Sequence, residues 1–467
     1  MNEFKLRRKR AMLGIFKLAV LFTLSSCGGS GSDPKPVVVT EPQPTTITIN
    51  TAATHQQMVG FGGALTWYSD RVISSSKKTE ISNLIFNDLG ADIIRLKNWY
   101  YPDNYPTSTS TDAMSDDNSK ASWAVTNQLY DLAKAQNPNV KILLSSWGPP
   151  AGLKSNSSSR EGTLLKDANG FMYDAFADYW VDLLDHLPFT PDYISIQNEP
   201  TFINSGWTTC QWSAAETASL PDYNIAFDKV HDKIKDRASV PVMIGPESQD
   251  IPTFSAFANV LKNKDYCGML AYHSYNINSG TTSDQIKTSL QTIGSFNTKP
   301  NIMTEFSDNL SSWFSTAQFI QNTLLYANSS GYIYWKLVWG TPTSGTDAGM
   351  VSINTAGQYT VTPFYYLIKH FSKHIDAGYT RVEASSSNTN LSVSSFISPD
   401  SKKLTVIIIN KGTSQVEVKF SATDKTIIGV SADQSSGSTY FKAVQNTSVS
   451  DPLIIPATSI TTVVLDI

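Results

Sequence analysis

The sequence predicts an α/β fold: a (β/α)8 TIM barrel with a C-terminal side β-sandwich that also takes an N-terminal strand. Between residues 57 and 339, eight short runs of branched and aromatic residues recur, each followed by a polar or helical stretch. After about residue 367 the pattern changes to short alternating segments separated by Ser, Asn, Gly and Asp, which is typical of antiparallel strands. With 467 residues, the chain is long enough for one large or two ordinary domains.

The eight runs are spaced widely enough for a strand, a loop, a helix and a return. They are residues 57–65, 92–99, 141–147, 193–200, 242–248, 268–275, 301–307 and 331–339. Helical periodicity fills the intervals, for example from Ala175 to Leu184 and from Ala317 to Leu325. Parallel strands need helical crossovers and cover on both faces, so we expect a closed barrel, with an open doubly wound sheet as the alternative.

These patterns divide the chain into five parts. We expect a signal peptide at 1–26, a lipid anchor and flexible tether at 27–44, an N-terminal sandwich strand at 45–52, a catalytic barrel at 53–367 and a β-sandwich at 368–467. The expected C-terminal strands are residues 391–397, 404–409, 416–420, 426–430, 440–444 and 460–465.

The N-terminus is typical of an exported lipoprotein. Five basic residues precede the apolar segment 11–24, which is shorter than the roughly 20 residues needed to span a bilayer. Leu24-Ser25-Ser26-Cys27 resembles a lipobox, in which Cys27 would be lipidated. We therefore expect an outer-membrane lipoprotein of a Gram-negative cell, facing the cell surface or the periplasm.

Charge and cysteine content exclude several function classes. Without residues 1–26 the chain keeps 30 basic and 39 acidic residues, a net charge of −9, which disfavours nucleic acid as a partner. Cys210 and Cys267 are too few for a metal site or a disulfide framework, although they could form one pair. No phosphate loop or His-Glu-x-x-His motif is present, so we expect no cofactor and no metal. Nothing in the sequence specifies an oligomeric state.

Two of the apolar runs end in a carboxylate. Glu199 lies in the fourth run and Glu305 in the seventh, and a barrel places its active site at these strand ends. A charge there must face a cleft, find a partner or be desolvated at a cost. Glu247, at the end of the fifth run, is a weaker third candidate. A facing pair of carboxylates suits cleavage of a glycosidic bond, in which one protonates the leaving oxygen and the other attacks or directs water.

Tryptophans accompany these carboxylates. Five of them lie at or just beyond strand ends, where rings can stack on the apolar faces of sugars. They are Trp67, Trp99, Trp147, Trp335 and Trp339. Packing is an equal alternative for Trp99 and Trp339. As a set, the five tryptophans predict a carbohydrate groove.

Five motifs in this order resemble glycoside hydrolase family 30, most closely its bacterial xylanase branch. They are Gly60-Phe61-Gly62-Gly63-Ala64, Ser146-Trp147-Gly148-Pro149-Pro150, Ser195-Ile196-Gln197-Asn198-Glu199-Pro200, Met303-Thr304-Glu305 and His370-Phe371-Ser372-Lys373. The resemblance covers residues 45–467 and implies a retaining mechanism on a barrel with a side sandwich.

The resemblance also implies roles for individual residues. Glu199 matches the acid/base, and Glu305 matches the nucleophile. Asn198 would hold the hydroxyl beside the reacting carbon, Arg95 would keep Glu305 ionised, and Tyr275 would donate a hydrogen bond to Glu305. Further substrate-binding positions are Trp147 and Trp335, which would wall the reacting sugar, and Trp67 and His273; a structural, hydrogen-bonded role is an alternative for His273.

One departure from the family pattern concerns substrate side groups. Many xylanases of this branch grip a glucuronic acid with basic residues after the eighth strand, where this chain has Val338 and Trp339. Lys336 is out of step by strand alternation. We therefore expect an endo-β-1,4-xylanase that acts on xylan without requiring glucuronate. The alternatives are an endo-β-1,6-glucanase or β-glucosidase of the same family, or a non-catalytic surface glycan-binding lipoprotein.

Overall fold

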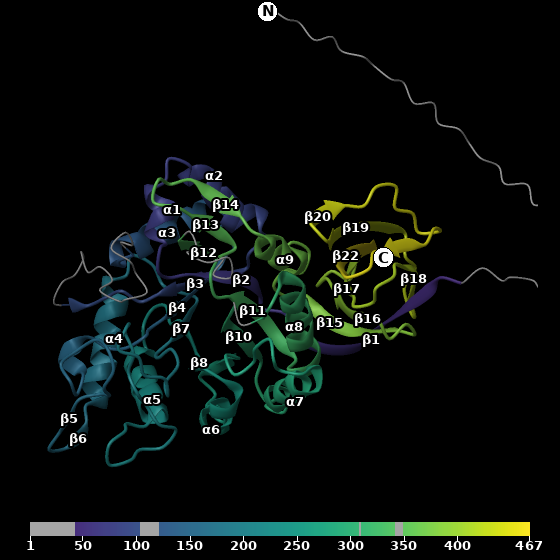
Figure 1. Cartoon of the computed structure of the whole chain (residues 1–467). Coiled ribbons are helices and arrows are strands. Elements are labelled where there is room, and N and C mark those ends of the chain that lie inside the picture. Colours follow the sequence, from purple (N-terminus) through teal and green to yellow (C-terminus); the bar gives the residue numbers. More distant parts are fainter. Residues whose placement is uncertain (1–42, 103–120, 308–309, 341–348) are drawn as a thin grey trace, which may run out of the picture. The chain divides into compact units, whose positions relative to one another are not determined.

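A computed structural model describes residues 43–102, 121–307, 310–340 and 349–467. Residues Pro44–Ile467 form one compact unit, and the predicted fold class is confirmed: a closed parallel barrel and a separate nine-stranded sheet (Figure 1). The predicted signal segment and Cys27 lie outside the described residues. Among the described helices, none combines the length and the apolar character that crossing a membrane requires.

The barrel closes in the strand order β10-β11-β2-β3-β4-β7-β8-β9. Its strands are β2 (Gly60–Leu65), β3 (Ile93–Lys97), β4 (Lys141–Ser145), β7 (Tyr193–Ser195), β8 (Val242–Ser248), β9 (Cys267–His273), β10 (Asn301–Phe306) and β11 (Ser329–Tyr334). Each overlaps one of the eight predicted runs. All neighbouring strands pair in parallel, so their carboxyl ends meet at one end of the barrel.

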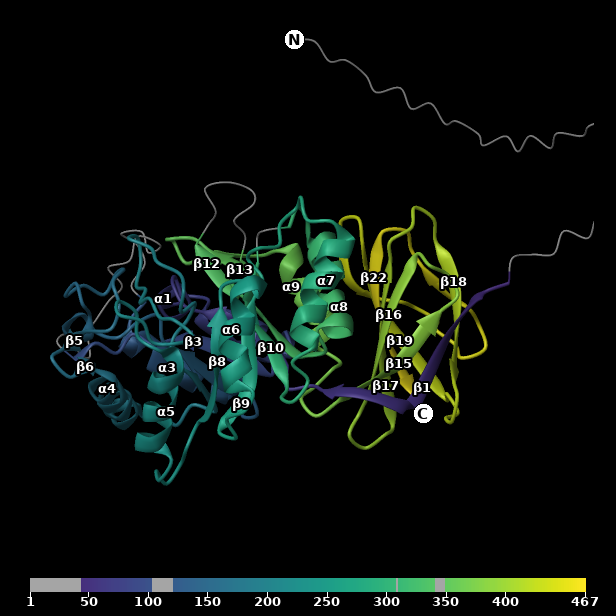
Figure 2. The ribbon, with the colours of Figure 1, turned by 90° about the horizontal axis from the view of Figure 1, so that it is seen from below.

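Helices surround the barrel strands (Figure 2). They are α1 (Asp70–Ser74), α2 (Lys78–Asn83), α3 (Trp123–Gln136), α4 (Tyr173–His186), α5 (Tyr223–Ile234), α6 (Ile251–Leu261), α7 (Ser283–Gly294), α8 (Trp313–Tyr326) and α9 (Pro363–Ser372). Side-chain caps fix several starts. At the start of α6 the Asp250 carboxylate accepts a hydrogen bond from the Thr253 amide. At the start of α7, Thr282 forms a capping box with Gln285.

The Gly-rich motif of β2 has a structural role. A Cβ on Gly62 would lie 1.7 Å from the Ile93 carbonyl oxygen, and one on Gly63 would lie 2.7 Å from Leu337 and Met350 side-chain atoms. Only a residue without a side chain lets β2 approach β3 and the segment after β11 this closely. The motif therefore serves to close the barrel.

The second sheet has the strand order β20-β19-β22-β17-β16-β15-β1-β18-β21. Its strands are β1 (Thr45–Gln57), β15 (Thr380–Ser386), β16 (Leu391–Ile397), β17 (Lys403–Asn410), β18 (Val416–Ala422), β19 (Gly429–Ser436), β20 (Thr439–Ala443), β21 (Leu453–Ile455) and β22 (Ser459–Asp466). The sequence pattern missed β15 and β21. Buried side chains from distant strands, including Ile47, Val406 and Ile455, share one apolar core, so the continuous sheet folds over on itself as a sandwich.

The N-terminal strand β1 joins the two halves of this sheet. It pairs antiparallel with β15 and parallel with β18, and it extends to Gln57, further than the expected 45–52 (Figure 1). Small additional sheets lie in the loops after the barrel strands. They are β5 (Lys166–Asp167) with β6 (Gly170–Phe171), and β12 (Val338–Gly340) with β13 (Val351–Ile353) and β14 (Tyr359–Val361).

Residue 367, where the sequence pattern places the domain boundary, lies inside α9. This helix is shared by both parts of the fold. His370 Nδ1 lies 2.8 Å from Thr462 Oγ1, and its Nε2 lies 2.7 Å from Ser435 Oγ, both in the sheet. Burial lowers the pKa of His370 to about 3, so the ring is neutral. Phe371 packs on Phe61 of the barrel at 5.7 Å between ring centroids, which gives the His-Phe-Ser-Lys motif a structural role.

The two remaining cysteines do not pair. Cys210 and Cys267 are both free thiols and both buried. Burial raises the pKa of Cys210 to about 11 and that of Cys267 to about 12, so neither is a reactive thiolate at neutral pH.

Candidate active site

A pocket of about 230 Å³ lies at the carboxyl ends of the barrel strands. Its lining combines two carboxylates with a majority of aromatic rings. The lining residues are Trp67, Trp147, Glu199, Phe202, Trp207, Gln249, Tyr275, Glu305, Ser307, Trp335 and Lys336. A second cavity of about 240 Å³ lies in the sandwich, but its lining is mainly apolar and holds a single acid, Asp451. The barrel pocket is therefore the one equipped for acid/base chemistry.

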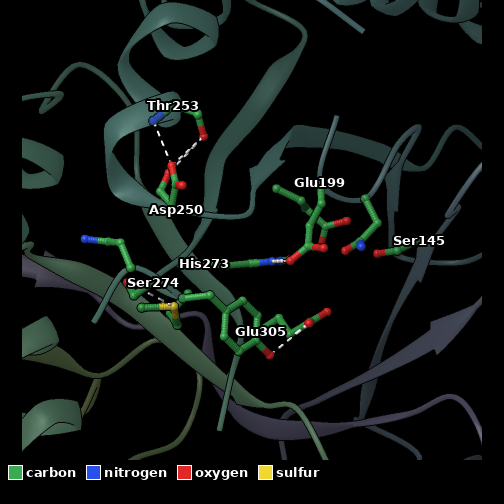
Figure 3. Close-up of polar contacts among 12 residues, drawn as sticks. Ser145, Glu199, Asp250, Thr253, His273, Ser274 and Glu305 are labelled. Atoms are coloured by element: carbon green, nitrogen blue, oxygen red, sulfur yellow. Dashed lines mark hydrogen bonds and ion pairs between the residues drawn. The ribbon is translucent and has the colours of Figure 1, made fainter. Parts of the chain in front are cut away.

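Glu199 and Glu305 reach this pocket from different strands. Glu305 belongs to β10, whereas Glu199 follows β7 in a left-handed conformation with φ of 48°, and its amide donates to the Glu247 carbonyl at 3.0 Å. Such backbone strain in a residue other than glycine is typical of functional sites. One carboxylate oxygen of each glutamate and one ring nitrogen of His273 lie within 4.8 Å of one another (Figure 3). Retaining glycosidases place their carboxyl groups about 5–5.5 Å apart, and inverting ones about 6.5–9.5 Å apart.

Arg95 organises the carboxylates from beneath the pocket. Its guanidinium is completely buried and donates from Nη1 to Glu305 Oε2 at 2.6 Å and from Nη2 to Asn198 Oδ1 at 2.6 Å. Its Nε donates to Ser145 Oγ at 3.1 Å and lies 3.1 Å from Glu247 Oε1. One positive charge thus serves two buried acids, which places an excess negative charge around the pocket.

The two pocket glutamates differ in proton affinity. Burial and the negative charge of Glu305 raise the pKa of Glu199 well above its usual range. Burial also raises the pKa of Glu305, to about 6, but Arg95 and the hydroxyl of Tyr275, which donates to Glu305 Oε1 at 2.9 Å, hold it down. At neutral pH the pocket therefore holds a protonated Glu199 and an ionised Glu305, the division of roles that an acid and a nucleophile need.

His273 contacts a glutamate and is absent from the pocket lining, where the sequence analysis expected it to meet substrate. Its ring is completely buried, and Nδ1 lies 3.1 Å from Glu199 Oε1 (Figure 3). Burial and the nearby charge of Arg95 lower the pKa of His273 well below its usual range, so the ring is neutral. A neutral imidazole can accept a hydrogen bond from protonated Glu199 or donate one to ionised Glu199. It can therefore hold the Glu199 side chain in both protonation states.

Three of the five tryptophans form the pocket wall. Trp67 packs edge-on against Trp147 and Trp335, each at 5.7 Å between ring centroids, and Arg95 lies 4.6 Å from the centroid of Trp147. These contacts fix the three rings around the buried guanidinium.

Trp99 and Trp339 do not line the pocket. They pack behind the wall, Trp99 on Trp67 at 5.9 Å and Trp339 on Trp335 at 6.1 Å between ring centroids. Of the predicted groove tryptophans, these two are packing residues.

Lys336 lies in the pocket, contrary to expectation. Strand alternation predicts that Lys336 is out of step with the pocket, but β11 ends at Tyr334, so a period of two does not extend to residue 336. Lys336 lines the pocket, and its Nζ lies 4.7 Å from the ring centroid of Trp339. Glu247 is completely buried against Arg95, and Asn198 is 4% exposed, and neither belongs to the lining.

Sequence reasoning missed four further lining residues. Phe202 and Trp207 lie on the loop after Glu199, and Gln249 and Ser307 follow β8 and β10. Their place just beyond strand ends was an available signal, but loop residues carry no periodicity that shows which way a side chain points.

One group among the described residues could also ligate a cation. Glu199, His273 and Glu305 each offer an atom, and these atoms lie within 4.8 Å of one another. The buried guanidinium of Arg95 already occupies one oxygen of Glu305 at 2.6 Å, and it would repel a metal ion at this point.

No family model matches the chain, but two characterised glycoside hydrolases are similar to it along most of its length. An endo-1,6-β-D-glucanase of Aspergillus fumigatus is 26% identical over 386 residues, covering 73% of this chain and 75% of its own length. A glucuronoxylanase of Bacillus subtilis is 22% identical over 442 residues, covering 90% and 92%.

Solved structures share the fold over nearly the same length. A glycoside hydrolase family 30 subfamily 8 xylanase of Clostridium acetobutylicum superimposes with a TM-score of 0.67 at 23% identity, covering 90% of this chain and all of its own. The catalytic domain of xylanase C of Talaromyces cellulolyticus gives 0.71 at 19% identity, again covering 90% and 100%.

A barrel pocket with two closely spaced carboxylates and an aromatic wall defines a glycoside hydrolase. The endo-1,6-β-D-glucanase and the glucuronoxylanase are enzymes of this class, and each matches most of this chain. The chain shares its fold with xylanases of glycoside hydrolase family 30, the family that its five motifs resemble.

Proposed function

We propose that the protein is a retaining endo-β-1,4-xylanase in which Glu305 is the nucleophile and Glu199 the acid/base. One observation carries this proposal: the two carboxylates lie within 4.8 Å and hold different proton affinities in an aromatic pocket. That separation is below the roughly 6.5–9.5 Å of inverting enzymes, so direct attack by the carboxylate is favoured over activation of water in the first step.

In the first step Glu305 attacks the anomeric carbon while Glu199 protonates the glycosidic oxygen. The C–O bond to the leaving sugar breaks, and its electron pair accepts the Glu199 proton. Tyr275 and Arg95 hold the two oxygens of Glu305 at 2.9 and 2.6 Å, which orients the attacking lone pair. A covalent glycosyl-enzyme results.

In the second step Glu199, now ionised, removes a proton from water, and the water attacks the same carbon. Glu305 leaves as a carboxylate next to Arg95, which stabilises its returning charge. The Asn198 carbonyl oxygen accepts from Arg95 at 2.6 Å, so its amide NH2 is the group left to donate to the hydroxyl beside the reacting carbon. That bond strengthens as the oxocarbenium ion develops.

Xylan is the proposed substrate because the similarity to the glucuronoxylanase spans 90% of this chain. Val338 and Trp339 stand where many xylanases of this branch carry basic residues, which supports cleavage of xylan without uronic acid. Endo-β-1,6-glucan hydrolysis is the second candidate, favoured by the 26% identity to the Aspergillus fumigatus enzyme over 73% of the chain. The same two glutamates serve either polymer.

The test is a product profile by mass spectrometry on linear xylan, glucuronoxylan, arabinoxylan and β-1,6-glucan. We expect xylo-oligosaccharides, including from linear xylan, and comparison with glucuronoxylan shows whether Lys336 adds a preference for an acidic side group. Glu305→Gln and Glu199→Gln should each abolish turnover of the polymer, whereas Glu417→Gln on the exposed surface should not. Products from β-1,6-glucan alone would reverse the choice of substrate, and an active Glu305→Gln would overturn the mechanism.

A glycan-binding protein without catalysis is the alternative from another class. It predicts that the wild type retains xylan on an affinity gel but releases no product from any of the four polymers. The differing pKa values of Glu199 and Glu305 argue against it, because binding alone does not need one protonated and one ionised glutamate.

We also propose that the protein is exported and anchored to the outer membrane through a lipid on Cys27. The basic start, the apolar segment 11–24 and Leu24-Ser25-Ser26-Cys27 support this location. A clickable fatty acid fed to the expressing cells should label the wild type and fail to label Cys27→Ser. Equal labelling of both would contradict the anchor.

A further inference from the structure

We propose that Lys97 is a positioning residue, whose buried ammonium fixes the rings of Trp67 and Trp147 and thereby sets the affinity for the sugar that becomes attached to the nucleophile. Lys97 is the last residue of β3, is completely buried and does not line the pocket, whereas both tryptophans do. This inference rests on the proposed function and adds to it which residue holds the pocket wall in shape.

Strand β3 supplies two cations to the same side of the barrel. Arg95 and Lys97 are two positions apart in this strand, so strand alternation points Lys97 to the side on which Arg95 meets Glu305. The Arg95 guanidinium lies 4.6 Å from the ring centroid of Trp147 and 5.9 Å from that of Trp335. Arg95 therefore fixes one part of the aromatic wall, and Lys97 is placed to fix the rest.

Four aromatic rings lie close to the Lys97 ammonium. The distances from Nζ to the ring centroids are 3.5 Å for Trp99, 5.5 Å for Trp67, 5.6 Å for Trp147 and 5.9 Å for Tyr101. A cation within about 6 Å of a ring centroid is attracted by the electron-rich face of the ring, and the attraction grows where water is excluded. All four contacts meet this condition, because Lys97 is shielded from solvent.

A buried lysine at this position needs a reason. Moving an ammonium out of water is costly, and an apolar side chain of similar volume would fill the same space without that cost. Lysine is accordingly among the residues that are least often fully buried. The charge of Lys97 acts on the rings of Trp67 and Trp147 from behind the wall, since Lys97 is absent from the pocket lining.

Order in these two rings matters for binding. Trp67 packs edge-on against Trp147 at 5.7 Å between ring centroids, so a shift of either ring displaces the other. A wall that is already ordered binds a sugar without the entropy cost of fixing its side chains. The reacting sugar meets this wall both before and during the reaction. Loss of the order should therefore raise KM and leave kcat nearly unchanged.

The test is kcat and KM of Lys97→Met on a neutral oligosaccharide of the polymer that the wild type cleaves. Methionine is unbranched like lysine but carries no charge. We expect KM to rise about tenfold, in line with one desolvated cation–π contact, and kcat to stay within about twofold. A merely structural role predicts the reverse, because a partly unfolded sample loses kcat per mole of protein at constant KM. Lys97→Arg keeps the charge, so its KM should lie close to the wild-type value.

Lys369→Met is the matched control. The Lys369 Nζ lies 5.1 Å from the ring centroid of Phe441 and 5.8 Å from that of Tyr365, and none of these residues lines the pocket. Removing this second lysine from its rings should leave KM unchanged. Thermal melting shows whether each variant is folded, and Lys97→Gln provides the measurement if Lys97→Met is not.

Each outcome separates this inference from the proposed function. An unchanged KM in folded Lys97→Met or Lys97→Gln overturns the role of Lys97 and leaves the proposed function standing. An equal rise of KM in folded Lys97→Arg overturns charge as the cause. A wild type that cleaves no oligosaccharide overturns the proposed function. Near-UV circular dichroism without substrate then decides the role of Lys97, because Lys97→Met should weaken the bands of ordered tryptophans, and an unchanged spectrum overturns it.

Discussion

Replacing Arg95 by Met is expected to move the acid limb of the pH profile of kcat/KM to higher pH. In the wild type this limb reports ionisation of Glu305, whose pKa is about 6. A cation next to a carboxylate favours the charged form, so removing the guanidinium raises the pKa of Glu305. The neighbouring charge of Glu247 then acts in the same direction, because it raises that pKa as well.

The size of the shift follows from the contact. Arg95 Nη1 lies 2.6 Å from Glu305 Oε2, so the charge centres are about 4 Å apart; at an effective dielectric constant of 20 their attraction is about 4 kcal/mol. At 1.36 kcal/mol per pKa unit this corresponds to at most about 3 units. We therefore expect the limb to move by about 1 to 3 pH units, and activity at pH 6 to fall about 5-fold to 500-fold, because the wild-type Glu305 is about half ionised there.

The assay is kcat/KM from pH 4 to 9 on the oligosaccharide that the wild type cleaves. Breaking a buried ion pair also costs about 3–5 kcal/mol of stability, so folding is checked by thermal melting. Arg381→Met is the matched control: Arg381 is 4% exposed but bonds to Gln56 and Asn328, remote from the pocket lining. A folded Arg95→Met with an unmoved acid limb would refute the electrostatic reasoning. Arg95→Lys keeps the positive charge, so its acid limb should lie close to the pH of the wild-type limb.

Three further predictions follow from the described contacts. Glu247→Gln should move the same acid limb to lower pH, since loss of this negative charge lowers the pKa of Glu305. His370→Gln should flatten the loss of stability on acidification. The folded pKa of His370 is about 3, so the unfolded chain binds its proton first, and the wild type loses about 1.4 kcal/mol per pH unit from pH 6.5 down to about 3. Cys210 and Cys267 should resist a maleimide until the protein unfolds, because both are buried with raised pKa values.

Each of these has a clear contrary result. An upward shift of the limb in Glu247→Gln would mean that Glu247 acts mainly through its hold on Arg95. Urea titration gives the slope of the unfolding free energy against pH. Equal slopes for the wild type and His370→Gln would show that His370 is not the source of the stability lost on acidification. Rapid labelling of the native protein, seen by mass spectrometry, would show that the thiols are accessible.

Much of the barrel was predictable because its signals are local. Each strand is a short apolar run, and the eight runs already count the strands. The strand-end rule then brings Glu199 and Glu305 to one end of the barrel without any knowledge of contacts. The two missed strands, β15 and β21, show the limit of the same signal: β15 is polar along most of its length, and β21 spans only three residues.

The sequence by itself determined the barrel, the added N-terminal strand and the pair of glutamates, because periodicity and strand-end position belong to neighbouring residues. Only the tertiary structure decided which rings line the pocket, that His273 holds Glu199, and that Lys336 reaches the same cavity. It also decided the proton states, because a pKa depends on burial and on charges such as that of Arg95, which lies 210 positions from Glu305 in the chain.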